Sequence, residues 1–179
     1  RHLQFENYPL FMENRARGGY DVRHWISGSG GSLVIAPNLN HKDPALRAII
    51  RDARFRKALS LAIDRDAVNE ANYFAVGTPR QMSPPPSSAF YSPGLERAYV
   101  EHDAARAGEL LDEMGLTERD RSGARLRPDG KPIKLYIETT ALNNRVLELV
   151  AGYWTKVGVK TEVKEEARQL FYQRKRALM

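Results

Sequence analysis

The sequence predicts an α/β protein in which helices pack on a sheet that contains parallel strands. Residues 133–139 alternate apolar and polar side chains, residues 146–157 place apolar side chains on one helical face, and residues 159–164 alternate again. A strand, a helix and a strand with short connections form a βαβ unit, which requires two parallel strands. The amphipathic run from Asp52 to Arg65 adds two consecutive helices, with Asp64 placed to cap the second.

The composition is that of an ordinary globular chain. Its 179 residues are 42% hydrophobic and 28% charged, and no run approaches the roughly 20 apolar residues of a membrane span. There are no cysteines, which removes disulfides, thiolate zinc sites and cysteine nucleophiles. The four histidines are scattered, and there is no Gly-x-Ser-x-Gly elbow. The sequence therefore predicts no catalytic residue, no metal site and no cofactor.

The positive charge raises the possibility of nucleic-acid binding. The net charge is +6 and the isoelectric point is about 9.6. The arginines are nevertheless spread along the chain and interleaved with acids, as in residues 118–121, and no basic stripe is evident. We expect no nucleic-acid partner, and a basic nucleic-acid-binding module stays the weaker alternative.

The first part of the chain is expected to be a helix–strand segment. Residues 7–17 suit a short helix, residues 20–26 a strand, and residues 27–32 a Gly/Ser loop. The loop lacks the Lys-Ser/Thr pair of a phosphate-binding P-loop, and its composition leaves open whether it is native or an artificial linker. Residues 33–36 are a short apolar run that predicts a buried strand. We expect residues 1–32 to form an N-terminal segment and residues 33–179 the main body of a single domain.

The middle of the chain is expected to be helical with one irregular stretch. Residues 78–99 are rich in proline and aromatic residues, which favours an ordered lid or wall loop over a polyproline ligand. Residues 120–132 are rich in turn formers and predict a small hairpin, because the acidic pattern of a calcium loop is missing. Helices are expected at residues 44–51, 54–63, 65–75, 104–114 and 166–177, the last with Leu170 and Phe171 pointing inward.

Several segments, in order, resemble the family 5 extracellular solute-binding proteins, which are the peptide-binding receptors of bacterial ABC importers. The resemblance extends at least from Leu33 to Phe171. The segments that carry it are Val34-Ile35-Ala36-Pro37-Asn38, Asp43-Pro44 with Asp52 to Asp66, Gly77-Thr78-Pro79 with Pro84-Pro85-Pro86, His102 to Leu116, and Trp154-Thr155-Lys156-Val157-Gly158-Val159-Lys160.

The resemblance implies a fold and a role. Family members have two α/β lobes that close on ligand by hinge bending. This chain, whose ends look cut, would be most of one lobe of a periplasmic-binding-protein type II-like fold, with a mixed sheet, flanking helices and a C-terminal βαβ unit. The implied function is capture of peptides or similar small solutes for import, in partnership with ABC permease subunits. The implied location is periplasmic or extracellular, with a lipid anchor left open. The alternative is an α/β enzyme domain whose catalytic residues lie elsewhere.

Candidate ligand-binding residues follow from where ligands sit in open α/β sheets. They bind beyond the carboxyl ends of strands, where helix N-termini offer free N–H groups. This picks Ala36 and Asn38 after one predicted strand, and Asn143, Asn144 and Arg145 after another. For the asparagines, capping and turn chemistry is the alternative role.

Four other prominent side chains are assigned structural roles. Arg54 and Arg56 match paired arginines of the family, and we expect them to donate hydrogen bonds to loop carbonyls. Tyr153 and Trp154 are expected to pack their helix onto the sheet.

Overall fold

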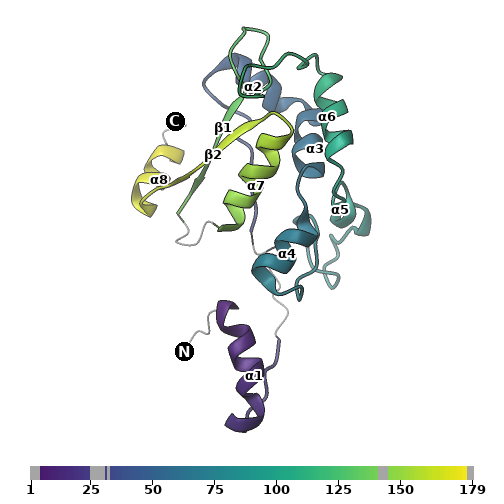
Figure 1. Cartoon of the computed structure of the whole chain (residues 1–179), viewed down its shortest axis with the longest axis vertical. Helices are drawn as coiled ribbons and strands as arrows, with labels where there is room; N and C mark the ends of the chain where they lie inside the picture. The colour runs from purple at the N-terminus through teal and green to yellow at the C-terminus, as the bar shows by residue number, and fades with distance from the viewer. Residues whose placement is uncertain (1–4, 25–30, 32, 141–144, 177–179) are drawn as a thin grey trace. The chain divides into compact units, whose positions relative to one another are not determined.

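The computed structural model describes residues 5–24, 31, 33–140 and 145–176. The chain divides into two compact units, of which the first contains Arg1–Leu33 and Asp66–Ala98 and the second Val34–Arg65 and Tyr99–Met179. Figure 1 labels the helices and strands of both units. The domain boundary expected after residue 32 stays a prediction. No helix in the described ranges is long and apolar enough to cross a membrane.

The second unit holds the sheet and its helices. Its elements are α2 (Pro44–Arg51), α3 (Ala53–Leu61), α6 (Ala104–Asp112), β1 (Lys134–Thr139), α7 (Arg145–Lys156), β2 (Lys160–Glu165) and α8 (Arg168–Arg176). The first unit contains a short 3-10 helix (Phe5–Asn7), α1 (Tyr8–Gly18), most of α4 (Arg65–Tyr73) and α5 (Pro93–Arg97). All the helices predicted from periodicity are present, with ends that shift by a few residues.

The predicted βαβ unit is confirmed. Strands β1 and β2 pair in parallel, with Lys134 opposite Lys160 and Thr139 opposite Glu165, and α7 connects them. Among the described residues the sheet has these two strands alone. It is therefore parallel, which corrects the expectation of a mixed sheet. Ile137 and Thr161 are buried, whereas the neighbouring Tyr136 is 56% exposed, as strand alternation requires.

The core of this unit lies between α7 and the pair α3 and α6. Phe55, Leu111 and Val159 are almost completely buried within it. Trp154 is buried in α7, and its indole Nε1 donates a hydrogen bond of 2.8 Å to the carbonyl oxygen of Leu59 in α3. Trp154 is thus a core residue as expected, but its polar contact joins α7 to α3, whereas the prediction was packing onto the sheet.

Aspartates begin the helices of this unit. Asp43, Asp52 and Asp103 cap α2, α3 and α6 by accepting hydrogen bonds from backbone N–H groups of the first turn. The loop-carbonyl contact predicted for the paired arginines is confirmed for Arg54, whereas the acceptors of Arg56 belong to helix α2. Arg54 donates to the carbonyl oxygen of Glu113 at 2.8 Å, and Arg56 donates to carbonyl oxygens at the end of α2.

A buried guanidinium joins four segments of this unit. Arg125 is 2% exposed and lies in the turn-rich segment before β1, where antiparallel bridges confirm the predicted hairpin pairing. It donates to the carbonyl oxygens of Val157 (2.9 Å), Gly108 (3.2 Å) and Leu116, and forms an ion pair with Asp112. These partners come from α6, the turn after it and the connection that follows α7.

Two predicted strands do not form among the described residues, and one predicted contact is wrong. Residues 20–24 and 33–36 have no strand structure, because no neighbouring strand among the described residues supplies their hydrogen bonds. Val34 is half exposed, although Ile35 packs against the core. The Gly/Ser loop lies almost wholly outside the described residues. Leu170 of α8 is 48% exposed and does not point inward, whereas Phe171 is half-buried.

Gly158, between α7 and β2, provides a test of this packing. Its φ is +95°, and a Cβ there would lie 2.5 Å from Arg119 Nη1 and 2.6 Å from Arg125 Cγ. We expect Gly158→Ala to lower the free energy of unfolding by about 1–3 kcal/mol in urea titrations. Gly152→Ala is the matched control, because Gly152 lies in α7 with open space around it. This substitution should raise the free energy of unfolding by about 0.5–1 kcal/mol. Equal effects of the two substitutions would contradict the packing described.

Candidate functional site

The carboxyl edge of the parallel sheet is the candidate site. Thr139 ends β1, Glu165 ends β2 directly opposite, and α7 begins nearby in the chain at Arg145. The first turn of α7, a helix of 12 residues, has the positive end of the helix dipole. This edge therefore has the chemistry to hold the carboxylate or carbonyl oxygens of a solute.

The structure places the predicted site residues in different settings. Arg145 is exposed as the first residue of α7, so the structure places it at the predicted helix start. Ala36 and Asn38 are exposed but do not lie at a strand end, which corrects the geometry expected for them. Asn38 Oδ1 accepts a hydrogen bond of 3.0 Å from the N–H of Asn40, which is turn chemistry. Asn143 and Asn144 lie outside the described residues.

An ion-pair cluster at this edge was missed from the sequence. Arg174 of α8 pairs with Glu138 of β1 at 2.7 Å and also with Glu166. Lys164 of β2 pairs with Glu166 at 2.7 Å. The backbone N–H of Glu166 donates to the carbonyl oxygen of Thr139 at 2.9 Å, which extends the sheet by one bond. The cluster thereby attaches α8 to the ends of both strands.

Burial makes the Glu166 carboxylate dependent on these cations. Its side chain is 3% exposed, and its Oε2 is buried without a hydrogen-bond partner among the described residues. The hydrogen bond from Lys164, followed by the charges of Arg174 and Lys164, lowers the pKa of Glu166 although burial acts in the opposite direction. Glu166 is therefore ionised at neutral pH. The signal in the sequence was slight, because Lys164 and Glu166 share one strand face but Arg174 is distant.

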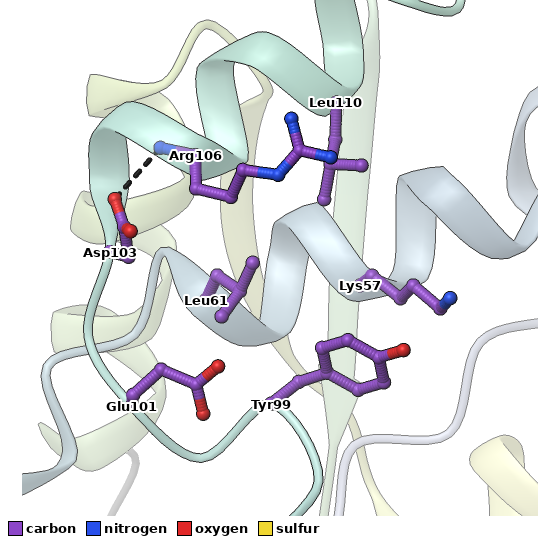
Figure 2. A pocket seen from close by; sticks show the side chains of 7 residues that line it. All are labelled: Lys57, Leu61, Tyr99, Glu101, Asp103, Arg106 and Leu110. Atoms are coloured by element: carbon purple, nitrogen blue, oxygen red, sulfur yellow. Dashed lines mark hydrogen bonds between the residues drawn. The ribbon is translucent and has the colours of Figure 1, made fainter.

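A separate pocket is lined in part by α3. It has a volume of about 300 Å³ between α3, α6 and the loop of residues 99–103. Figure 2 shows the side chains that line it, which are Lys57, Leu61, Tyr99, Glu101, Asp103, Arg106 and Leu110. Nothing in the sequence pattern indicated this pocket.

Within residues 5–24, 31, 33–140 and 145–176, no group of three or more His, Cys, Asp or Glu side chains is arranged to hold a metal ion.

Comparison with known proteins identifies the class of protein. Residues 6–178 match the family described as "Bacterial extracellular solute-binding proteins, family 5 Middle". The chain belongs to this family, which confirms the resemblance drawn from its segments. Members of the family bind solutes.

The fold class is confirmed by solved structures. The structure of an oligopeptide-binding protein OppA has a TM-score of 0.87 and 42% sequence identity, over 96% of this chain and 27% of that chain. This match agrees with an α/β lobe of a periplasmic-binding-protein fold.

Two curated relatives are more distant in sequence. "Heme-binding protein A" of Haemophilus influenzae is 29% identical over 120 residues, which are 64% of this chain and 20% of that protein. "Periplasmic alpha-galactoside-binding protein" of Rhizobium meliloti is 27% identical over 159 residues, which are 79% of this chain and 21% of that protein. The chain thus spans about a fifth of each of these relatives.

The Glu166 cluster predicts a pH-dependent attachment of α8. Because the pKa of Glu166 is lower in the folded state than in the unfolded state, its ionised form stabilises the fold above the ordinary glutamate range. Glu166→Gln should lower the urea midpoint and speed amide exchange in α8 at pH 7. Both differences from the unmodified protein should shrink as the pH falls below about 4.3.

Glu148→Gln is the matched control, because Glu148 is exposed on α7 and makes no ion pair among the described residues. If Glu166→Gln lowers the urea midpoint by the same amount at pH 7 and at pH 3.5, the charge of Glu166 does not attach α8.

Proposed function

We propose that this chain is the ligand-binding part of a solute-binding protein that captures peptides for import by an ABC transporter. The observation that carries the proposal is family membership over residues 6–178, in a chain whose parallel sheet ends beside the start of α7. The protein acts by binding and release, without catalysis.

Peptides are favoured over the other solutes of relatives. The OppA structure combines the higher identity, 42%, with coverage of 96% of this chain. The relatives named for heme and for α-galactosides are 29% and 27% identical over shorter parts of the chain. A peptide also suits the chemistry of the sheet edge, because its carbonyl and carboxylate oxygens accept hydrogen bonds from backbone N–H groups at a helix start.

The proposed contacts are those predicted from the sequence. Arg145, with Asn143 and Asn144 before it, would meet peptide oxygens beyond the end of β1. Ala36 and Asn38 would be further ligand contacts. The exposed side chain of Arg145 supports its part in this proposal.

The partners and the location follow from the same family. The protein would work outside the cytoplasmic membrane, in the periplasm or the extracellular space, and would deliver its solute to ABC permease subunits. A lipid anchor would be one way to hold it near them.

Calorimetry with three solutes tests this proposal. We expect the purified protein to bind trialanine, and to give no heat with melibiose, which is an α-galactoside, or with hemin. Arg145→Gln should weaken trialanine binding roughly tenfold, because a charge-assisted hydrogen bond to the peptide is lost.

Arg168→Gln is the matched control, since Arg168 is likewise the exposed first residue of a helix, α8. It should leave the affinity unchanged. Binding of melibiose or hemin in preference to trialanine would overturn the peptide assignment, and equal losses for the two arginine variants would remove Arg145 from the site.

A further inference from the structure

The pocket between α3 and α6 is distinct from the sheet edge and plays no part in the proposed peptide site. Its walls are well fixed. Leu61 and Leu110 are 4% and 7% exposed, so they form the floor from two packed helices. The N–H of Asp103 donates to the carbonyl oxygen of Leu61 at 2.9 Å, which ties the loop of residues 99–103 to the end of α3.

Tyr99 forms one side of this pocket in an unusual conformation. Its φ is +55°, in the left-handed region that non-glycine residues rarely adopt. Such a conformation persists only where neighbouring groups impose it, and it is concentrated at functional sites. The strain thus indicates that the position of the Tyr99 ring is specified by its surroundings.

A half-buried arginine and a serine hold this conformation. The Ser60 hydroxyl donates to the carbonyl oxygen of Tyr99 at 2.7 Å. Arg65 donates to the Ser60 hydroxyl at 2.8 Å, to the Ser60 carbonyl at 2.8 Å and to the Val100 carbonyl at 3.2 Å. Burial lowers the pKa of Arg65, and the charge of Glu101 acts against that shift without forming an ion pair. The pocket is therefore preformed.

Two charged groups of opposite sign face the pocket and have no ion-pair partner in the part of the chain that the structure describes. Arg106 is neutralised by Glu109 at 2.9 Å and Glu113 at 2.8 Å. Asp103 accepts the N–H of Arg106 as a helix cap, which is the dashed line in Figure 2. Lys57 and Glu101 make no ion pair with any described residue.

The arrangement of these two groups suits a ligand that carries both charges. The Lys57 ammonium lies 4.9 Å from the centre of the Tyr99 ring. In the view of Figure 2, Glu101 and Lys57 lie on opposite sides of Tyr99. The ring, which is 39% exposed, offers apolar surface between them.

We propose that this pocket binds a small zwitterion of amino-acid size, with its ammonium near Glu101 and its carboxylate near Lys57. A volume of about 300 Å³ is at the lower end for ligand pockets, which limits the occupant to a single amino acid or a molecule of similar size. Asp103 and Arg106, already committed to partners, shape the entrance.

L-Leucine is a suitable probe, and backbone amide NMR of the whole protein is a suitable measurement. We expect the amide signals of residues 57–61 and 99–106 to shift on titration, with a dissociation constant on the order of 1 mM. Leucinamide lacks the carboxylate and 4-methylpentanoate lacks the ammonium. Each should bind about two- to fivefold more weakly, which is the range for one exposed ion pair.

Two variants test which pocket side chain contacts each charged group of leucine. Lys57→Gln should abolish the preference for leucine over leucinamide, and Glu101→Gln should abolish the preference for leucine over 4-methylpentanoate. Lys156→Gln is the matched control for the lysine, since Lys156 lies 5.3 Å from the ring centre of Tyr153 on α7. Glu148→Gln is the control for the glutamate, and both controls should keep the full preference.

Three outcomes would overturn the assignment. One is the absence of shifts in residues 57–61 and 99–106 up to about 20 mM leucine. Another is binding that both pocket variants leave unchanged. The third is a set of shifts centred on residues 138–139 and 145–148, which would place leucine at the sheet edge. That last result would leave the proposed solute-binding function standing while removing this pocket from it.

Discussion

The buried guanidinium of Arg125 is the interaction on which the second unit depends. A buried charge is costly unless hydrogen bonds satisfy it. Arg125 meets this requirement with three carbonyl oxygens and the carboxylate of Asp112, supplied by α6, by the turn after it and by the connection from α7 to β2. The same connection contains Gly158, whose missing Cβ leaves room for the stem of Arg125. The helices that line the pocket and the strands that form the sheet edge are thereby held in one body.

Local periodicity predicted the helices and the βαβ unit because each of them satisfies its backbone within one segment or between near neighbours. The predicted strand at residues 33–36 was wrong because a strand cannot satisfy its backbone within its own segment. An apolar run becomes a strand only when another strand supplies hydrogen bonds, and none of the described residues does so. The first unit joins residues 1–33 with 66–98, and a boundary search along a linear sequence does not detect such a discontinuous grouping.

The backbone setting of the candidate site was predictable from the sequence, but its side-chain contacts were not. The rule that ligands sit beyond strand ends selected Arg145, which the structure places at the start of α7. Asn38 was assigned on a strand that does not form, and its side chain makes the turn contact that was the alternative. The cluster of Glu138, Glu166 and Arg174 combines side chains from β1, from the residue after β2 and from α8, so no spacing rule would find it. The pocket likewise depends on the backbone of Tyr99, which composition does not encode.

Unfolding of Arg125→Met in urea is the measurement that tests the account most directly, because this side chain joins the elements that carry both sites. The substitution leaves several buried carbonyl oxygens without donors and should lower the free energy of unfolding by about 3 kcal/mol or more. Arg121→Met is the matched control, since Arg121 is exposed in the same turn-rich segment and should change stability by less than about 0.5 kcal/mol. Losses of similar size for the two variants would contradict the central role of Arg125.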